Sequence, residues 1–107
     1  MQHLRAHQLA EWLSDVSKSK PVLLDVRESW EFETCSLPGS LHMPMHLVPL
    51  RCGELNPGQE IVVICHHGAR SMQVAMFLER KGFSAVFNLL GGVEGWACDV
   101  DPAMNRY

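Results

Sequence analysis

A cysteine, two histidines and an arginine lie close together within the segment Cys65–Ser71, which reads CHHGARS. The segment follows the β-branched run Ile61–Ile64 and leads into a helical pattern of apolar residues that extends to Lys81. A cysteine between a buried strand and a helix lies where backbone amides and the helix N-terminus favour a negative charge. We therefore expect the thiolate of Cys65 to be stabilised, which makes it a candidate nucleophile.

The neighbours of the cysteine fit an anion-binding loop. Gly68 tolerates the backbone conformations that a tightly curved ring of amides requires. Arg70 keeps its charge, so it either pairs with an anionic substrate or holds the shape of the loop, and both roles are open. His66 and His67 are expected to point outward, where they either add positive charge at mildly acidic pH or are solvated without a specific role. A buried thiol that only packs is the alternative for Cys65, and the glycine, the arginine and the strong helix argue against it.

The rest of the chain supplies the elements that would hold this loop. Apolar and β-branched runs predict strands at residues 22–25, 40–43, 61–64 and 83–89. Periodicity and turn residues predict helical segments at about residues 6–16, 28–33, 47–50, 71–81 and 91–96. Strands that alternate with helices indicate an α/β fold with a mostly parallel sheet covered on both faces. In such a sheet, functional groups gather beyond the carboxyl ends of the strands, where Cys65 is expected to lie.

Two of the predicted helices have an apolar face that should pack on the sheet. In the first helix the face is formed by Leu4, Leu9, Trp12, Leu13 and Val16. In the helix after the cysteine it is formed by Met72, Ala75, Met76, Phe77 and Leu78, with Gly82 at the C′ position. We assign Met72, Met76 and Trp96 to the core rather than to the wall of a pocket.

The composition limits the class of protein. With 107 residues, of which 47% are hydrophobic and 20% charged, the chain is expected to form one domain over residues 1–107, with a core at about 4–100 and an irregular C-terminal tail. No apolar run is long enough to span a bilayer, and residues 1–15 lack the features of a secretory signal, so we expect a cytoplasmic protein without membrane contact. The net charge of -3 and the scattered basic residues argue against a nucleic-acid partner.

The remaining cysteines, Cys35, Cys52 and Cys98, show neither CxxC spacing nor a dense disulfide framework, and we interpret them as reduced thiols. A zinc site built from Cys65, His66 and His67 would need a further chelating pair at suitable spacing, and none is apparent. We therefore expect no metal site.

The segment CHHGARS resembles the active-site loop of rhodanese-homology sulfurtransferases, in which Cys-x-x-Gly-x-Arg-Ser is common. Further segments are similar to motifs of this family and occur in the same order, namely VLLDVRE at 22–28, LPGS at 37–40 and LGGVEGW at 90–96. An ordered match over roughly residues 4–100 is far more specific than any one motif. The chain departs from the family at Cys35-Ser36, where Gly-His is frequent, so any role of that histidine is not carried over.

The resemblance implies a five-stranded, mostly parallel sheet with helices on both faces and a sulfurtransferase (rhodanese) activity without metal or organic cofactor. Cys65 is carried over as the catalytic residue, whose thiolate takes a sulfane sulfur from a donor such as thiosulfate and becomes a persulfide. Cyanide in vitro, or a cellular thiol or protein acceptor, then removes the sulfur. The matching active-site loop is His66, His67, Gly68, Ala69, Arg70 and Ser71, and the possible periphery of the site is Asp25, Arg27 and Trp96.

Some alternatives stay open beside this interpretation. For the charges of Asp25, Arg27 and Glu28, an ion pair that fixes the strand-end turn is favoured over a place of Asp25 at the mouth of the site. The protein could be a persulfide carrier or sensing module rather than an enzyme. A cysteine phosphatase or arsenate reductase is disfavoured, because their loop is CX5R whereas Cys65 and Arg70 form CX4R, which should be too tight for a tetrahedral oxyanion.

Two further properties are expected of the protein. Cys35, Cys52 or Cys98 could resolve the persulfide, but packed or incidental thiols are the favoured interpretation. The chain is expected to be a monomer or a weak homodimer.

Overall fold

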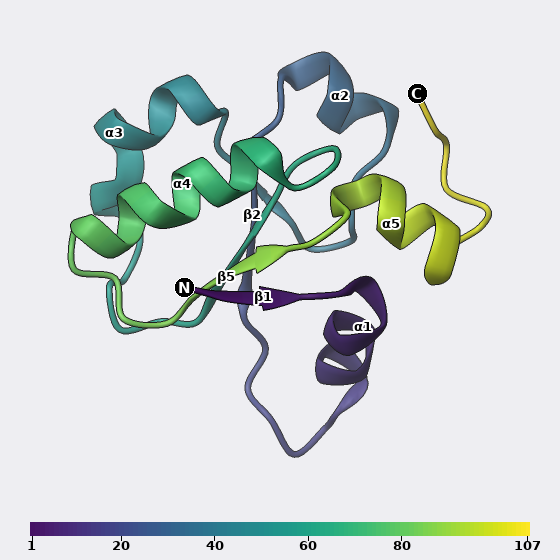
Figure 1. Ribbon diagram of the computed structural model, residues 1–107, viewed down its shortest axis with the longest axis horizontal. Helices are drawn as coiled ribbons and strands as arrows, with labels where there is room; N and C mark the ends of the chain where they lie inside the picture. Colours follow the sequence, from purple (N-terminus) through teal and green to yellow (C-terminus); the bar gives the residue numbers. More distant parts are fainter.

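The computed structural model describes residues 1–107 and shows a five-stranded sheet between two layers of helices (Figure 1). The strands are β1 (Gln2–Leu4), β2 (Val22–Asp25), β3 (Leu41–His42), β4 (Ile61–Ile64) and β5 (Val86–Leu89). The helices are α1 (Ala6–Ser14), α2 (Ser29–Thr34), α3 (Val48–Arg51), α4 (Ala69–Arg80) and α5 (Gly92–Asp99). Turns of 3-10 helix, η1 (Met45–Leu47) and η2 (Cys52–Glu54), flank α3. The predicted α/β fold with a five-stranded sheet is confirmed.

The strand order is β1-β5-β4-β2-β3, with every neighbouring pair parallel, so β4 is the central strand. All residues of β4 are fully buried, which explains why its sequence is a continuous β-branched and aliphatic run rather than an alternating one. The register aligns Asp25 of β2 with Ile64 of β4. The carboxyl ends of β2 and β4 therefore lie side by side, and the segments that follow them meet at one end of the sheet.

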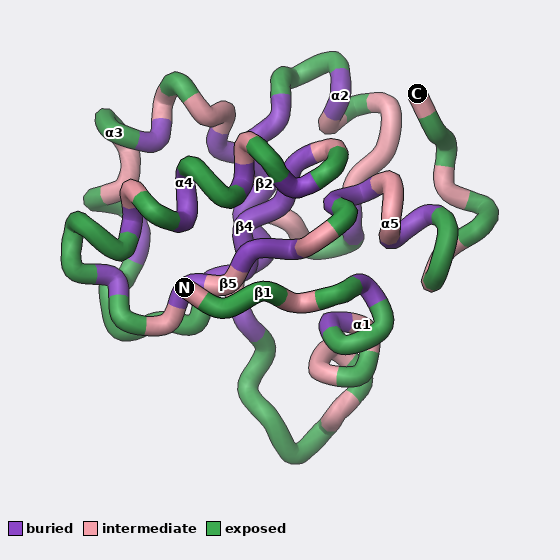
Figure 2. The backbone as a smooth tube through the Cα atoms, viewed as in Figure 1, coloured by how far each residue is buried: buried purple, intermediate pink, exposed green.

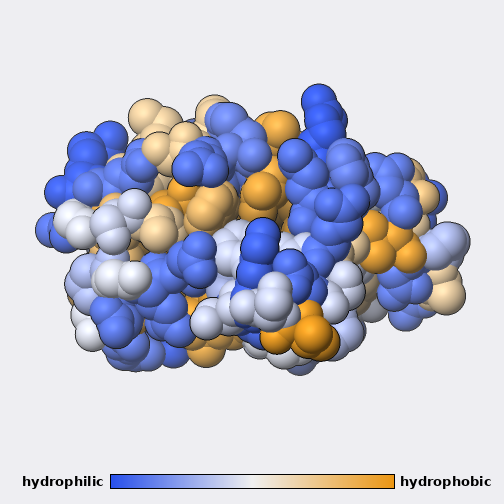
Figure 3. All heavy atoms as spheres, turned by 90° about the horizontal axis from the view of Figure 1, so that it is seen from below, coloured by the Kyte–Doolittle hydropathy of each residue, from blue (hydrophilic) through white to orange (hydrophobic).

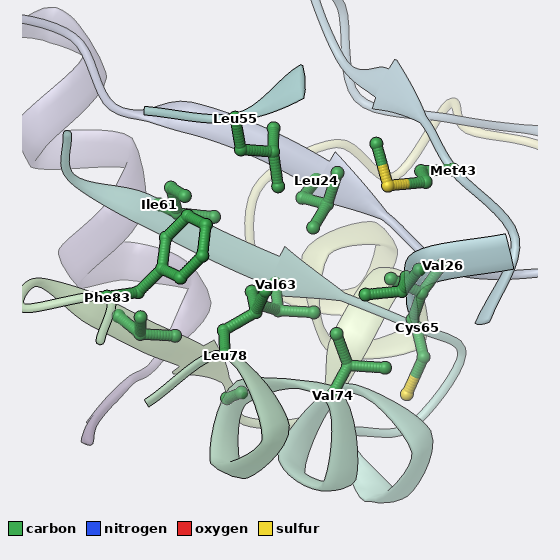
Figure 4. Packing of buried hydrophobic residues seen from close by; sticks show 13 residues of the cluster. Leu24, Val26, Met43, Leu55, Ile61, Val63, Cys65, Val74, Leu78 and Phe83 are labelled. Carbon is green, nitrogen blue, oxygen red and sulfur yellow. The ribbon is translucent and has the colours of Figure 1, made fainter. Parts of the chain in front are cut away.

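Alternate residues of the strands face two separate cores, because side chains of a strand point to opposite faces. On one face, Val63 packs with Val74 and Leu78 of α4 (Figure 4). On the other face, Val62 packs with residues of α1 and α5, including Trp96. The tube in Figure 2 shows the mostly buried strands β2, β4 and β5 in the middle of the molecule, the largely exposed β1 at the edge, and exposed residues on the outer sides of the helices. The assignment of Trp96 to the core is confirmed.

Helix α4 begins at Ala69, earlier than the predicted start at Ser71, because Gly68 takes the N-cap position with φ 114°. Its C-terminal end agrees with the prediction, since Gly82 lies after the C-cap with φ 97°. The N–H groups of Gly82 and Phe83 donate to the carbonyls of Glu79 and Leu78, which is the Schellman pattern.

This C-terminal cap also corrects the strand predicted at residues 83–89. Phe83 still belongs to the cap of α4, so the strand begins only at Val86. A second difference is β1, which the local sequence pattern did not predict. It has only three residues, and Gln2 and His3 are exposed, so it lacks an apolar run. It is an edge strand that pairs with β5.

Three apolar residues that were predicted to lie on the core faces of α1 and α4 are exposed. Met72 and Met76 are 40% and 44% exposed, because the buried face of α4 is formed by Ser71, Val74, Ala75 and Leu78, and the two methionines lie one position away from it. Val16 is exposed because α1 already ends at Ser14. The apolar face predicted for α4 is therefore rotated by about one position from the face that is buried, and the helix predicted for α1 is too long at its C-terminal end.

The surface shows no continuous apolar belt on the face in Figure 3, where hydrophilic residues dominate and hydrophobic atoms reach the surface in separate patches. None of the helices combines the length and the hydrophobicity that crossing a membrane requires.

Candidate active site

Cys65 directly follows β4, is 1% exposed, and points its side chain toward α4 near Val74 (Figure 4). The backbone N–H of Gly68 donates to the Cys65 Sγ at 3.0 Å, and the Ser71 Oγ lies 3.3 Å from the same sulfur. Gly68 reaches this position in the left-handed region, which glycine adopts without strain. The sulfur thus faces a backbone donor at the start of a 12-residue helix, where partial positive charge favours a sulfur anion.

Ser71 connects the sulfur to a second buried polar side chain. The Ser71 hydroxyl, fully buried, donates to the Asn88 Oδ1 on β5, and Asn88 is 1% exposed. The Asn88 Nδ2 lies 3.3 Å from the His3 Nδ1 on β1. A chain of polar contacts therefore leads from the Cys65 sulfur along the α4 side of the sheet to an exposed histidine on the edge strand.

The N-terminus of α5 holds the backbone of the loop from the other side. The N–H of Val93 donates to the carbonyl of Cys65 at 2.9 Å, and that of Glu94 donates to the carbonyl of His66 at 3.1 Å. Gly92, with φ 55°, allows this approach, because a Cβ at Gly92 would overlap both carbonyl groups. A glycine at position 92, the first residue of α5, is thus required by the contact with the cysteine loop.

Arg70 does not project freely from the loop. Its Nη1 and Nη2 donate to the Glu31 Oε1 and Oε2 at 2.7 Å and 2.8 Å, and the Glu31 side chain is only 5% exposed. These hydrogen bonds from Arg70 lower the pKa of Glu31 to about 2, against the effect of burial. The same contact raises the pKa of Arg70 above its ordinary value. Of the two roles left open by the sequence, the pairing favours the one that holds the loop in place.

Asp25 and Arg27 form a fully buried ion pair, with 2.7 Å between the Asp25 Oδ2 and the Arg27 Nη2. Although burial opposes its charge, hydrogen bonds with Asp25 and Tyr107 raise the pKa of Arg27 above its ordinary value. The guanidinium also donates to the carbonyls of Glu31 and Cys35. The prediction that these charges form an ion pair at the strand-end turn is confirmed, and the pair anchors α2 to the sheet.

The C-terminal tail folds back onto the loop, which no pattern in its sequence indicated. The Tyr107 hydroxyl accepts from the Arg27 Nη1 at 2.8 Å and donates to the Glu31 Oε2 at 2.9 Å. The Tyr107 ring stacks on His66, with 4.2 Å between the centroids, and meets Trp30 edge to face. Burial raises the pKa of Tyr107 to about 12. Tyr107 thus links the strand-end turn, α2 and the cysteine loop.

The two histidines of the loop differ in their surroundings. His67 is exposed, as predicted, whereas His66 is partly buried, because the ring of Tyr107 from the C-terminal tail stacks on it. Burial, and then the neighbouring His67, lower the pKa of His66, although Glu94 lies 4.0 Å from its Nε2. The side chain of His66 is therefore a poor source of added positive charge at mildly acidic pH.

The remaining candidate residues lie outside the immediate contacts of the sulfur. Ala69 is exposed at the first turn of α4, and Cys35, Cys52 and Cys98 are free thiols. No group of three or more His, Cys, Asp or Glu side chains is arranged to hold a metal ion. Glu31 is a residue that sequence reasoning missed. Its Oε1 accepts from the Glu28 N–H at 2.9 Å, so an acidic residue at this helix start could have been recognised as a cap, but not as the partner of Arg70.

A model of the rhodanese-like domain family matches residues 8–99 of the chain. A sulfurtransferase of Allochromatium vinosum is 38% identical over 76 residues, which cover 71% of this chain and 71% of that protein. The thiosulfate sulfurtransferase GlpE of Pseudomonas syringae pv. syringae is 37% identical over 75 residues, which cover 70% of this chain and 71% of that protein.

The fold is also similar to a solved structure. The crystal structure of a rhodanese-like domain protein from Staphylococcus aureus has a TM-score of 0.82 and 25% identity, and the match covers 90% of this chain and 91% of that one. Some relatives are much longer. The chain matches 30% of the length of the chloroplastic rhodanese-like/PpiC domain-containing protein 12 of Arabidopsis thaliana, at 40% identity over 89 residues.

Proposed function

The chain belongs to the rhodanese-like domain family, and from this membership and the surroundings of Cys65 we propose that it transfers sulfane sulfur through a Cys65 persulfide. The observation that carries the proposal is the position of the Cys65 sulfur, which receives the Gly68 N–H at the start of α4. A buried donor and a helix N-terminus stabilise a sulfur anion, which both the attacking thiolate and the product persulfide contain. The sulfurtransferases among the relatives support the same class of reaction.

We propose thiosulfate as a donor, since a relative carries the name thiosulfate sulfurtransferase. The Cys65 thiolate attacks the outer sulfur of thiosulfate, the bond between the two thiosulfate sulfurs breaks, and sulfite leaves with the electron pair of that bond. The anionic Cys65 persulfide that forms is stabilised by the Gly68 N–H and by the dipole of α4. A thiol or cyanide then attacks the outer sulfur of the persulfide and restores the thiolate. No redox cofactor is required for either step.

The length of the loop favours sulfur over phosphate. Four residues separate Cys65 from Arg70, and the Arg70 guanidinium is already bound to the Glu31 carboxylate. A phosphate dianion would have to compete with this carboxylate and would also need more room between the amides than one added sulfur atom. We therefore propose that hydrolysis of an aryl phosphate is much slower than transfer of sulfur from thiosulfate to cyanide.

The experiment that tests the proposal is intact mass spectrometry after incubation with thiosulfate and removal of the excess. The wild-type protein should gain one sulfur, and Cys65→Ser should gain none. Cys98→Ser is the matched control, because Cys98 is an exposed thiol, and it should load as the wild type does. A sulfur gain that persists in Cys65→Ser would refute Cys65 as the carrier. A loaded protein that cyanide does not discharge would indicate a persulfide carrier instead of an enzyme.

The same proposal extends to the organisation and partners of the protein. We propose that residues 1–107 act as one domain, in which the sheet, both helical layers and the tail contribute to the Cys65 loop. A small sulfur donor and a thiol or protein acceptor are the partners that this chemistry requires. A reducing compartment such as the cytoplasm suits a free reactive thiol.

A further inference from the structure

A continuous set of polar contacts joins the Cys65 sulfur to the surface of the sheet on the side of β1. The Ser71 Oγ lies 3.3 Å from the sulfur and donates to the Asn88 Oδ1, and the Asn88 Nδ2 lies 3.3 Å from the His3 Nδ1. Ser71 and Asn88 are 0% and 1% exposed, whereas His3 is exposed on the edge strand. Because β1 and β5 are parallel and pair His3 with Asn88, the contact between these two side chains follows from the register.

The direction of these hydrogen bonds matters for the sulfur. A serine hydroxyl has one hydrogen, and in this structure Ser71 gives it to the Asn88 Oδ1. The Ser71 oxygen then presents lone pairs to Cys65, which suits a thiol that donates its hydrogen but not a thiolate that needs one. Asn88 and a Cys65 anion therefore compete for the same hydrogen.

The competition ends if the side-chain amide of Asn88 flips by about 180°, so that its Oδ1 and Nδ2 exchange places. The Asn88 Nδ2 then donates to the Ser71 Oγ, the Asn88 Oδ1 faces His3, and the hydroxyl hydrogen of Ser71 is free to point at the sulfur. This arrangement requires a hydrogen on the His3 Nδ1, which the imidazole carries in one of its neutral tautomers and in its protonated form. In the arrangement of the structure, the His3 Nδ1 accepts from the Asn88 Nδ2 instead.

We propose that Ser71, Asn88 and His3 form a reversible hydrogen-bond relay, in which Asn88 and His3 act as positioning residues that set the share of Cys65 held as a thiolate. The inference rests on the proposed role of Cys65 as a nucleophile. The charges nearest the sulfur on its own segment are Arg70, which is paired with Glu31, and the N-terminus of α4. The other charged or titratable groups around the loop are its own His66 and His67, Glu94 of α5, Tyr107 of the tail and the ion pair of Asp25 and Arg27 at the end of β2. They act on the sulfur by charge, whereas the relay acts through one hydroxyl hydrogen.

The test measures the ultraviolet absorbance of the Cys65 thiolate as a function of pH and takes the midpoint of the titration. The absorbance of the same variant with Cys65→Ser is subtracted, which removes the signal of the other thiols. Asn88→Leu removes the competing acceptor, so the Ser71 hydroxyl turns to the sulfur and the midpoint falls by about one pH unit. Ser71→Ala removes the donor, and the midpoint rises. A purely structural role for Asn88 predicts no fall in the midpoint.

A second variant acts at the exposed end of the relay, where folding is less at risk. In His3→Asp, a carboxylate oxygen takes the place of the Nδ1 and can only accept, so Asn88 is held with its Oδ1 toward Ser71 and the midpoint rises. The added negative charge alone would also raise it, so the same change is made in a Ser71→Ala background, where the relay is broken. The rise should largely disappear in that background, whereas an effect of charge would remain and would also weaken with salt.

Two results would overturn the relay: an unchanged or higher midpoint in folded Asn88→Leu, or a His3→Asp shift of equal size with and without the Ser71 hydroxyl. If Asn88→Leu does not fold, the His3→Asp comparison decides alone. Because these measurements use no sulfur donor, they can fail while sulfur loading of Cys65 is intact. Conversely, a protein that cannot be loaded with sulfur can still show the relay.

Discussion

The guanidinium of Arg70 binds the carboxylate of Glu31 through two hydrogen bonds, 2.7 Å and 2.8 Å long, although the two residues are 39 positions apart in the chain. The contact joins the first turn of α4, next to the cysteine loop, to α2. Glu31 is almost completely buried and also accepts from the Glu28 N–H and the Tyr107 hydroxyl. The position of the Cys65 loop therefore depends on a carboxylate in a different segment of the chain.

Arg70→Lys and Glu31→Gln should each slow the loading of sulfur from thiosulfate by about tenfold, because a lysine or an amide cannot reproduce the two-bond contact. The double variant should be no slower than either single variant, since all three remove the same contact. Stopped assays of sulfite release measure these rates. If Glu31→Gln loads faster than the wild type, the released Arg70 binds the anionic donor and the loop-holding role is wrong.

The free energy of unfolding should decrease as the pH is lowered from about 5 to about 2, because Glu31 becomes protonated in this range. Arg70 lowers the pKa of this carboxyl from its ordinary value of 4.5 to about 2, so the unfolded chain takes up the proton first. The ionised Glu31 contributes up to about 2 kcal/mol to the free energy of unfolding, after allowance for the solvent around Arg70. This contribution is complete above about pH 5 and is lost as the pH falls through the pKa of Glu31 in the folded protein. Urea unfolding at several pH values measures it. Glu31→Gln is the control, and its stability difference from the wild type should shrink as the pH falls; a constant difference would contradict the assignment.

The parts of the site that could be predicted from the sequence are those made by neighbours in the chain. Cys65 and Gly68 belong to one strand-to-helix turn, and Asp25 and Arg27 flank the end of one strand. Their spacing already implies the geometry of an amide loop and of a short-range ion pair.

The missing parts are contacts between segments far apart in the chain. Tyr107 meets Arg27 across 80 positions, and Asn88 meets His3 across 85. No local periodicity encodes such a pair, and β1 was missed for a related reason, since three residues at a sheet edge bury too little to show a strand pattern. The exposed Met72 and Met76 show that periodicity predicts a helix better than it predicts which face is buried.

Tyr107 should titrate near pH 12 in the folded protein and near its ordinary value of 10 in urea. Burial is the main cause, since it raises the pKa of the phenol by disfavouring the phenolate, and the hydrogen bond that Tyr107 donates to Glu31 acts in the same direction. The stability that depends on a neutral Tyr107 is therefore complete below pH 10 and is lost as the pH rises through the folded value of about 12. Tyr107 is the only tyrosine of the chain, so the ultraviolet absorbance of tyrosinate reports on this residue alone.

Two variants test whether the titration of Tyr107 reports on the contact of the C-terminal tail with Glu31. Glu31→Gln should lower the midpoint of Tyr107, because the hydroxyl loses a carboxylate acceptor that opposes its ionisation. Arg51→Gln is the control: it removes a cation at the end of α3 whose salt bridge is with Glu54 of η2 rather than with Tyr107, so it should leave the midpoint unchanged. A folded wild type that titrates near pH 10 would mean that the tail is not held on the loop in solution.

Gly92→Ala should destabilise the protein by more than about 3 kcal/mol, whereas Gly95→Ala in the same helix should be neutral or stabilise it by about 0.5 kcal/mol. A Cβ at Gly92 would overlap the backbone carbonyls of Cys65 and His66, and these atoms cannot rotate away as a flexible side chain can. At Gly95 the nearest atom, the carbonyl oxygen of Leu90, is 3.7 Å from the added Cβ, which is an ordinary contact. Urea unfolding gives both free energies.

Gly92→Ala and Gly95→Ala should also differ in the rate at which Cys65 is loaded with sulfur. The amides of Val93 and Glu94 hold the carbonyls of Cys65 and His66, so a helix pushed away by Gly92→Ala would release the loop and the Gly68 N–H from the sulfur. Gly92→Ala that still folds should therefore load sulfur more slowly than Gly95→Ala, which leaves the loop in place. Equal stability and equal loading of the two variants would show that α5 does not hold the cysteine loop, because only the close approach at Gly92 distinguishes them.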